Sequence, residues 1–236
     1  MLFADRRAAV AGGFDPADLT GFVEAWVGSS LSGVAATADT WPGLTGAHDL
    51  TQATAAARPQ IETDAGKRYA LFDGVDDFIL KNPYTQGSAA GHSIFVSVRM
   101  TASGNFPIFF ASRSAVREMR CSGTSRIPQH TTNNGGGAVS APDPGGVLTI
   151  GTDYVVGVTV DFATDAVAIY IDGVQVATGT DNTDPTSLTS SILCIGARSD
   201  GTLPLPARVY GATYCEAALS PAEVASLTTY LQGLHP

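Results

Sequence analysis

The sequence has few cysteines, and their number excludes one class of protein. Only 3 of the 236 residues are cysteine. An odd, sparse set does not form the paired framework of a small secreted domain. Cys194 and Cys215 both lie in segments that read as strands, so the sequence leaves a bond between them open. We favour three buried free thiols, Cys121 included, as in a protein that folds in a reducing cytoplasm.

Positive charge is also scarce. The chain has 13 lysines and arginines against 22 aspartates and glutamates, which gives a formal net charge of -9. No basic surface matches a phosphate backbone, so nucleic acid is excluded as a partner, and the negative sign disfavours anionic membrane surfaces. The surplus of acids serves solubility first, and binding of a divalent cation is the alternative.

Long apolar runs are absent from the sequence. No stretch approaches the roughly 20 apolar residues of a membrane span, so we expect no membrane insertion. Arg6 and Arg7 precede a short apolar run, but Asp5 stands before them and no cleavage site follows, unlike in an export signal. We interpret residues 1–14 as an N-terminal docking arm and residues 15–236 as one domain. On this view the protein leaves a cell only within a particle or by lysis.

Glycine, proline and alternating apolar residues are plentiful. The chain is 44% hydrophobic and 15% charged, with 26 glycines and 13 prolines, a composition typical of a packed core built from many short strands joined by turns. Alternation of apolar residues predicts strands at residues 22–27, 69–72, 75–80, 93–100, 106–111, 154–162, 166–171, 174–178, 191–197 and 207–214, with weaker ones at 118–121 and 138–140.

Two local motifs define a turn and a helix. Asp172-Gly173 between alternating apolar runs predicts a two-residue hairpin turn with positive φ at both positions. Ser220, Pro221 and Glu223 form a capping box with proline at the first helical position, and an amphipathic helix follows. We expect this helix to cover a sheet edge or an end of the fold. Many short strands, one terminal helix and no βαβ alternation predict an all-β antiparallel sandwich.

Three segments resemble a known family. Residues 41–80 contain a tryptophan followed by HDLTQAT, ARP and FDGVDD, residues 166–180 read AVAIYIDGVQVATGT, and residues 192–231 end in ALSPAEVASLTTYL. They resemble concanavalin A-like jelly-roll domains of the laminin-G-like type, which are common in tailed-phage virion proteins and bacterial surface proteins. The resemblance implies a jelly-roll fold. It is less specific for activity, because this fold hosts lectins, hydrolases, adhesins and assembly modules.

Catalytic patterns are missing from the sequence. A glycosidase needs two carboxylates across the scissile bond, and the resemblance implies that they would alternate along one strand. Glu62 and Asp64 alternate, but we place them in a loop or strand end, while Asp76 and Asp77 would face opposite sides of a strand. Glu118 stands alone. The four histidines show no pairing with serine or cysteine and no zinc spacing, so we predict no catalytic residues and no enzyme.

Calcium binding is harder to dismiss. Laminin-G-like relatives can bind this ion through loop carboxylates, and aspartates stand at expected strand ends at positions 73, 76, 77, 161, 165 and 172. Calcium requires roughly 6 to 8 converging oxygens. Asp73 and Asp172 are explained by turns, so we predict no cofactor and no metal site, with calcium as the alternative.

Glycan-binding residues are expected in loops, where exposed polar and aromatic side chains meet. The candidates are Trp41, Tyr84, His92, Asn133, Asn134, Arg198 and Asp200. We expect Trp41, like Trp26, to pack within the framework of the sandwich, as a core or lid residue. Our predicted ligand-binding residues are therefore Asn133, Asn134, Arg198 and Asp200.

The resemblance and the missing motifs together suggest a role. We predict a non-enzymatic virion structural or adhesion protein of a phage or phage-like particle, in a spike, a fibre or a tail-associated structure. It would assemble in the host cytoplasm as a homo-oligomer, bind other virion proteins and contact host surface glycans. A secreted or surface calcium-dependent lectin and a glycan-cleaving hydrolase are the alternatives.

Overall fold

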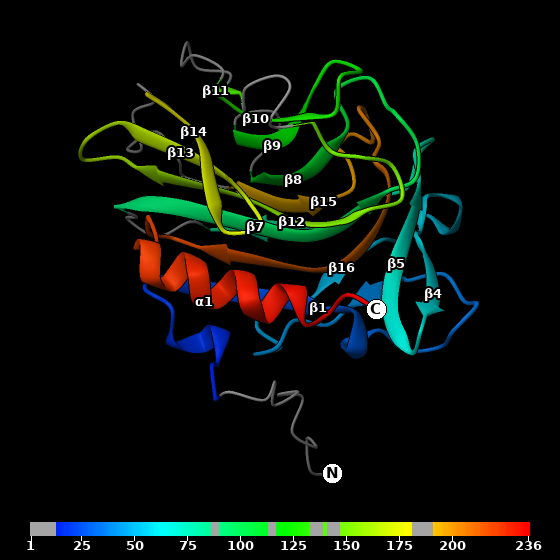
Figure 1. The fold of residues 1–236 in the computed structure, drawn as a ribbon. Coiled ribbons are helices and arrows are strands. Elements are labelled where there is room, and N and C mark those ends of the chain that lie inside the picture. The colour runs from blue at the N-terminus through cyan, green and yellow to red at the C-terminus, as the bar shows by residue number, and fades with distance from the viewer. Residues whose placement is uncertain (1–12, 86–89, 113–116, 133–138, 141–146, 181–190) are drawn as a thin grey trace.

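Two antiparallel sheets lie face to face, and one α-helix packs on the outside of the stack (Figure 1). The computed structural model describes residues 13–85, 90–112, 117–132, 139–140, 147–180 and 191–236. This architecture confirms the predicted antiparallel β-sandwich with a C-terminal helix. None of the helices in these ranges is long and apolar enough to cross a membrane.

The described part of each sheet has eight strands. Sheet A runs in the order β14 (Val174–Thr180), β13 (Ala166–Ile171), β12 (Asp153–Asp161), β7 (Gly91–Met100), β16 (Pro206–Cys215), β5 (Lys67–Asp73) and β4 (Gln60–Asp64), with β1 (Phe22–Val27) also paired to β16. Sheet B runs in the order β11 (Val139–Ser140), β10 (Ile127–Thr132), β9 (Arg117–Ser122), β8 (Ile108–Ser112), β15 (Ser191–Ile195), β6 (Ile79–Tyr84), β3 (Leu50–Thr51) and β2 (Thr40–Trp41). Short 3-10 helices lie at Pro16–Asp18, Gly28–Ser30 and Ala55–Ala57.

The main core fills the space between the sheets. Every second residue of the two central strands points into it, so that Val96 of β7 lies opposite Val156 of β12 and both are fully buried. Trp26 and Trp41 are also fully buried there, and their indole N–H groups donate to backbone carbonyls, 2.8 Å to His48 and 3.0 Å to Val27. The expectation that both tryptophans belong to the framework is confirmed.

The two local motifs form as predicted. Asp172 and Gly173 have φ of 50° and 79° and join β13 to β14, which is the backbone that a two-residue hairpin turn requires. The helix α1 spans Pro221–Gln232, and the Ser220 and Glu223 side chains each bond the other's backbone N–H. Both motifs depend on neighbours only a few positions apart, which is why the sequence reveals them.

The position of α1 differs from the expectation. The helix packs on the outer face of sheet A, against β7, β12 and β16, and not at a sheet edge (Figure 1). Leu227 and Leu231 of α1 are fully buried in a second apolar cluster with Phe95 of β7. The reason is that β7 carries apolar side chains on both faces of sheet A. Val96 points into the core, and Phe95 points outward, where α1 buries it.

Several strand predictions need correction. Strict alternation over residues 22–27 predicts Phe22, Glu24 and Trp26 on one face, but a bulge between Phe22 and Glu24 of β1 shifts the pattern, and Phe22 packs in the same cluster as Val27. The strands β4 and β10 are not among the predicted strands, because neither segment shows a clear apolar alternation. Of the predicted 75–80 strand, only Ile79 and Leu80 lie in β6, and the chain before them bends at residues 74–76.

All three cysteines are free and buried, as favoured from the sequence. Cys194 lies in a small apolar cluster on sheet B and Cys215 in the cluster beneath α1 on sheet A, so the two are not neighbours. Burial raises the pKa of Cys121 and of Cys215 to about 12. The three thiols are therefore packing groups and not nucleophiles.

Candidate functional site

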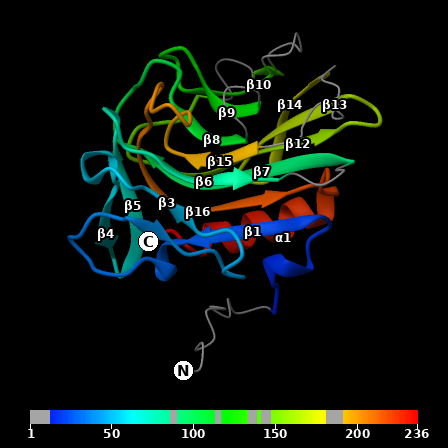
Figure 2. The ribbon, with the colours of Figure 1, turned by 180° about the vertical axis from the view of Figure 1, so that it is seen from behind.

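The outer face of sheet B carries a group of charged side chains. Along β9, Met119 and Cys121 point into the core, and the residues that alternate with them, Glu118 and Arg120, point to the outer face. Sheet B has no helix on this side in the described ranges, whereas α1 covers sheet A (Figure 2). Charged groups that reach the surface on this side of the sheet are available to a ligand.

Glu118, Arg120 and Arg198 form one ion-pair network, which we name the outer-face cluster. Arg198 donates from Nε to Glu118 Oε1 at 2.5 Å and from Nη2 to Oε2 at 3.2 Å. Arg120 donates from Nη1 to the same Oε2 at 3.0 Å. The Glu118 side chain is only 1% exposed, and the two arginine side chains are 24% and 17% exposed. The carboxylate is thus buried beneath two guanidinium groups that reach the surface.

The network changes the acidity of both arginines. The hydrogen bond to Glu118 raises the pKa of Arg198. Burial lowers the pKa of Arg120, and the positive charge of Arg198 lowers it further, against the attraction of Glu118. Both groups are charged at neutral pH, because arginine starts from a pKa above 12.

A tight loop holds Arg198 in place. Its backbone N–H bonds to the Thr202 carbonyl at 3.0 Å, and its carbonyl accepts from Gly201 at 2.9 Å. Asp200 Oδ1 accepts from the Thr202 backbone at 3.0 Å and from its hydroxyl at 2.6 Å. The Thr202 hydroxyl bond lowers the pKa of Asp200, so this carboxylate is ionised and committed to the loop.

Apolar and aromatic groups surround the cluster. Ile108, Ala111 and Cys194 form a buried floor, and the partly buried side chains packed on it are Phe78, Leu80, Ile192 and Leu203. Phe106 lies beneath Arg120, with the guanidinium carbon 4.9 Å from the ring centre. The face therefore combines planar charged donors with apolar contact surface.

The structure describes two of the four predicted ligand-binding residues. The structure places Arg198 in the outer-face cluster and Asp200 in the loop that positions it. Asn133 and Asn134 lie outside the described residues. The weaker candidates Trp41, Tyr84 and His92 are buried, so they are framework residues. Sequence reasoning missed Glu118 and Arg120, although their alternation with Met119 and Cys121 was a signal for an outward-facing pair.

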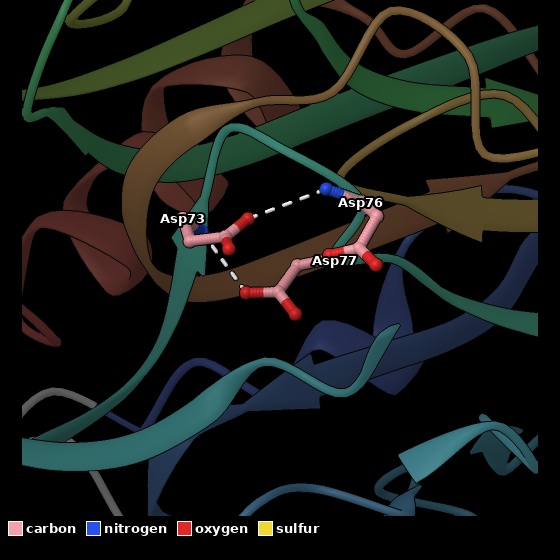
Figure 3. A group of neighbouring side chains, drawn as sticks. All are labelled: Asp73, Asp76 and Asp77. Atoms are coloured by element: carbon pink, nitrogen blue, oxygen red, sulfur yellow. Dashed lines mark hydrogen bonds between the residues drawn. The ribbon is translucent and has the colours of Figure 1, made fainter. Parts of the chain in front are cut away.

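A second group of acids lies between β5 and β6. Asp73, Asp76 and Asp77 each have a carboxylate oxygen within 4.8 Å of the others (Figure 3). The chain here is a bend and not a strand, so Asp76 and Asp77 do not face opposite sides as expected. Asp73 Oδ1 accepts from the Val75 backbone at 2.7 Å, and Asp77 Oδ2 accepts from the Asp73 backbone at 2.9 Å.

The three carboxylates differ in exposure. Asp73 and Asp76 are exposed and Asp77 is buried. Burial raises the pKa of Asp77 to about 6, against the lowering effect of the Asp73 backbone N–H. Hard oxygen ligands of this kind suit calcium, and Asp73, Asp76 and Asp77 are the residues that would hold it.

The two alternating acids that the sequence analysis weighed as a catalytic pair have structural partners. Glu62 and Asp64 lie on β4. Glu62 accepts from the Tyr69 hydroxyl at 3.0 Å, and Asp64 pairs with Arg99 at 2.9 Å and with Arg208 at 2.7 Å on sheet A. These bonds tie β4 to β5, β7 and β16 and give neither acid a free role.

Comparisons with known proteins agree with this fold. Residues 73–225 match the model of the concanavalin A-like lectin/glucanases superfamily. No curated protein matches the chain in sequence. A Trypanosoma rangeli sialidase in complex with sialic acid superposes with a TM-score of 0.65 and 14% identity, over 91% of this chain and 33% of the sialidase. The chain thus spans a third of that enzyme's length.

Two further solved structures share the architecture. Domain 4 of AbnA, a GH43 extracellular arabinanase from Geobacillus stearothermophilus in complex with arabinotriose, matches with a TM-score of 0.64 and 15% identity, over 89% of this chain and 100% of the domain. A SAP-like pentraxin from Limulus polyphemus matches with a TM-score of 0.54 and 12% identity, over 70% of this chain and 83% of the pentraxin. At such identities these likenesses establish the fold alone. The family match covers well over half of the chain, and the protein belongs to the concanavalin A-like lectin/glucanase superfamily.

Proposed function

We propose that this protein binds glycans through the outer face of sheet B and does not cleave them. The observation that carries the proposal is the outer-face cluster, whose two arginine side chains reach the surface on the side of the sandwich away from α1. Arginine guanidinium groups donate several hydrogen bonds in a fixed plane, which suits adjacent sugar oxygens. The partly buried side chains of Phe78, Leu80 and Leu203 offer apolar contact for the C–H face of a sugar ring.

The state of the nearby acids supports a non-catalytic role. A glycosidase needs one carboxylic acid with a raised pKa opposite a second carboxylate. On this face, Glu118 is tied to two arginines and the pKa of Asp200 is lowered. Both oxygens of Glu118 are engaged by arginines, and the ionised Asp200 has no proton to donate to a leaving group.

The wider role that we propose is that of a virion protein. The support is the resemblance of residues 41–80 to domains of tailed-phage virion proteins. In a spike, fibre or tail-associated structure, a homo-oligomer would present several copies of the glycan-binding face, and weak single contacts would add up to firm attachment. Other virion proteins would be its neighbours.

A glycan array with the full chain tests the first part. We expect binding to a defined set of glycans, unchanged by a chelator, and no release of sugar from the bound glycans. An array without any bound glycan would contradict the proposal. Co-purification with capsid or tail proteins tests the virion role, and purification from phage-free cultures without such partners would contradict it.

A calcium-dependent lectin is the second candidate, and the aspartates 73, 76 and 77 favour it. In that case the array signal would vanish with a chelator and return with calcium. The Asp76→Asn variant would weaken the response to calcium, whereas Asp165→Asn, in a turn between β12 and β13, would not.

A hydrolase is the third candidate, and the raised pKa of Asp77 beside two further acids favours it. Such an enzyme would release reducing ends from a bound glycan. Loss of this release in Asp77→Asn, with folding intact, would establish catalysis and overturn the non-enzymatic proposal.

A further inference from the structure

We infer that the outer-face cluster recognises a carboxylate on an acidic sugar, so that the preferred glycans contain uronic acid residues. This inference rests on the proposed glycan binding and specifies the chemical class of the ligand. Its basis is the arrangement of Glu118, Arg120 and Arg198, whose donors and charges are only partly used within the protein.

The first argument concerns unused donors. Glu118 takes Nε and Nη2 of Arg198 and Nη1 of Arg120, and Gln129 Oε1 accepts from Arg120 Nε at 3.3 Å. In the part of the chain that the structure describes, Nη1 of Arg198 and Nη2 of Arg120 have no hydrogen-bond acceptor. Both side chains are partly exposed, so these N–H groups are open to a ligand.

The second argument concerns charge. Two guanidinium groups share one carboxylate, so the three side chains of the cluster carry one net positive charge in a chain with net charge -9, and the ionised Asp200 offsets part of it. Asp200 attracts Arg198 from the same loop but forms no ion pair with it among the described residues. The two arginines repel each other. An anion bound on their solvent side, opposite the buried Glu118, would reduce this repulsion.

The third argument concerns geometry. Glu118 fixes both guanidinium planes from below, so no side-chain freedom is lost when a ligand arrives from above. A carboxylate presents two oxygens that match two guanidinium N–H groups, and charge-assisted bonds of this kind are about twice as strong as neutral ones. A neutral sugar hydroxyl gains only part of this energy.

Isothermal titration calorimetry with oligogalacturonate tests the inference, and its methyl ester is the matched ligand. The ester keeps the sugar backbone and removes the charge. We expect the acid form to bind at least about tenfold more tightly than the ester. The advantage should shrink when the salt concentration rises, because ion pairs at a surface are screened.

The variants separate the site from general charge effects. Arg198→Gln should weaken oligogalacturonate binding at least about tenfold. The affinity of Arg198→Lys should lie between those of the wild type and Arg198→Gln, because lysine keeps the charge without the planar fork. Arg208→Gln is the control. It removes the same charge from sheet A, where Arg208 pairs with Asp64, and should leave binding unchanged.

Wild-type protein provides a measurement that needs no variant. In NMR spectra of the arginine side chains, oligogalacturonate should shift the Nε resonances of Arg120 and Arg198 and leave that of Arg208 in place. If glycans bind but acid and ester bind equally, or if Arg208→Gln weakens binding as much as Arg198→Gln, the inference is wrong and glycan binding stands. Preference for a sulfated neutral glycan over the uronate would also overturn it, and binding of no glycan would overturn both proposals.

Discussion

Arg198 lies side-on against the carboxylate of Glu118, with Nε 2.5 Å from Oε1 and Nη2 3.2 Å from Oε2. The two residues are 80 positions apart in the sequence. The pair joins the loop after β15 to β9 of sheet B, so it should contribute to stability as well as to ligand binding.

Removing Arg198 should destabilise the protein. Glu118 is almost fully buried and, among the residues that the structure describes, would keep Arg120 as its one ion-pair partner. Loss of a partner from a buried carboxylate costs several kcal/mol; because Arg120 remains, we expect Arg198→Gln to lower the free energy of unfolding by about 2 kcal/mol. Urea denaturation measures this change.

The sheet A pair between Arg208 and Asp64 is the matched control. Its side chains are about a third exposed, so Arg208→Gln should cost less than about 1 kcal/mol. Equal losses in the two variants would show that Glu118 is more solvated than its position in the structure indicates.

Stability should fall as the pH rises from about 4 to about 6. Burial raises the pKa of Asp77 to about 6. The folded state therefore holds a proton in this range that the unfolded state, with a pKa near 3.8, has already lost. The titration of Asp77 therefore lowers the free energy of unfolding by on the order of 2 kcal/mol between pH 4 and pH 6.

The Asp77→Asn variant should remove this decrease. Asparagine keeps an oxygen for the Asp73 backbone N–H and carries no charge, so its unfolding free energy should change less between pH 4 and pH 6. Denaturant titrations at several pH values measure the difference. Asp76→Asn, at an exposed position, should retain most of the wild-type slope; a wild-type curve that rises through this interval would contradict the prediction.

Gly43→Ala should destabilise the loop that precedes β3. A Cβ at Gly43 would lie 2.3 Å from Cδ of Glu24. Glu24 cannot move away, because it is fully buried and accepts from the Thr45 backbone at 2.9 Å and from its hydroxyl at 2.5 Å. We expect a loss of about 3 kcal/mol in unfolding free energy, at the upper end for an overpacked site.

Gly46→Ala is the comparison for this loop. A Cβ at Gly46 meets nothing within 4 Å, but its φ of +74° disfavours alanine, at a cost of about 1 kcal/mol. The two variants are compared by urea denaturation. If Gly46→Ala were the more damaging, the close packing of Gly43 on Glu24 would be wrong.

Acid should loosen the start of α1. Burial by itself would raise the pKa of Glu223, but hydrogen bonds from Ser220 and from the Thr20 backbone outweigh it and lower the pKa to about 2. A lowered carboxyl pKa gives stability that is present above pH 4.5 and is lost as the pH falls towards 2. Glu223→Gln should weaken this dependence and lower stability at pH 7 by about 1 kcal/mol.

Helix content followed by circular dichroism between pH 2 and pH 5 measures the effect. Ser226→Ala changes an exposed residue of the same helix without touching Glu223 and should keep the wild-type pH profile. A Glu223→Gln variant with the same acid transition as the wild type would contradict the proposed origin of the pKa shift.

Local structure follows from short stretches of the amino-acid sequence. The alternation in residues 93–100, the Asp172-Gly173 turn and the Ser220 capping box each depend on residues within a few positions, so they were readable and are confirmed. Of the segments that resemble the family, residues 166–180 and most of residues 192–231 lie within the 73–225 range that the family model matches, whereas most of residues 41–80 lies before it.

Which charged groups meet depends instead on how distant segments pack together. Arg198 reaches Glu118 because β8 and β15 pair and place the following loop beside β9, and that pairing depends on the packing of the whole sandwich. Asp73 and Asp77 come together because the chain bends where a strand was expected. Neither contact leaves a local pattern in the sequence, since strand order and register are set by burial of apolar surface across segments far apart in the chain.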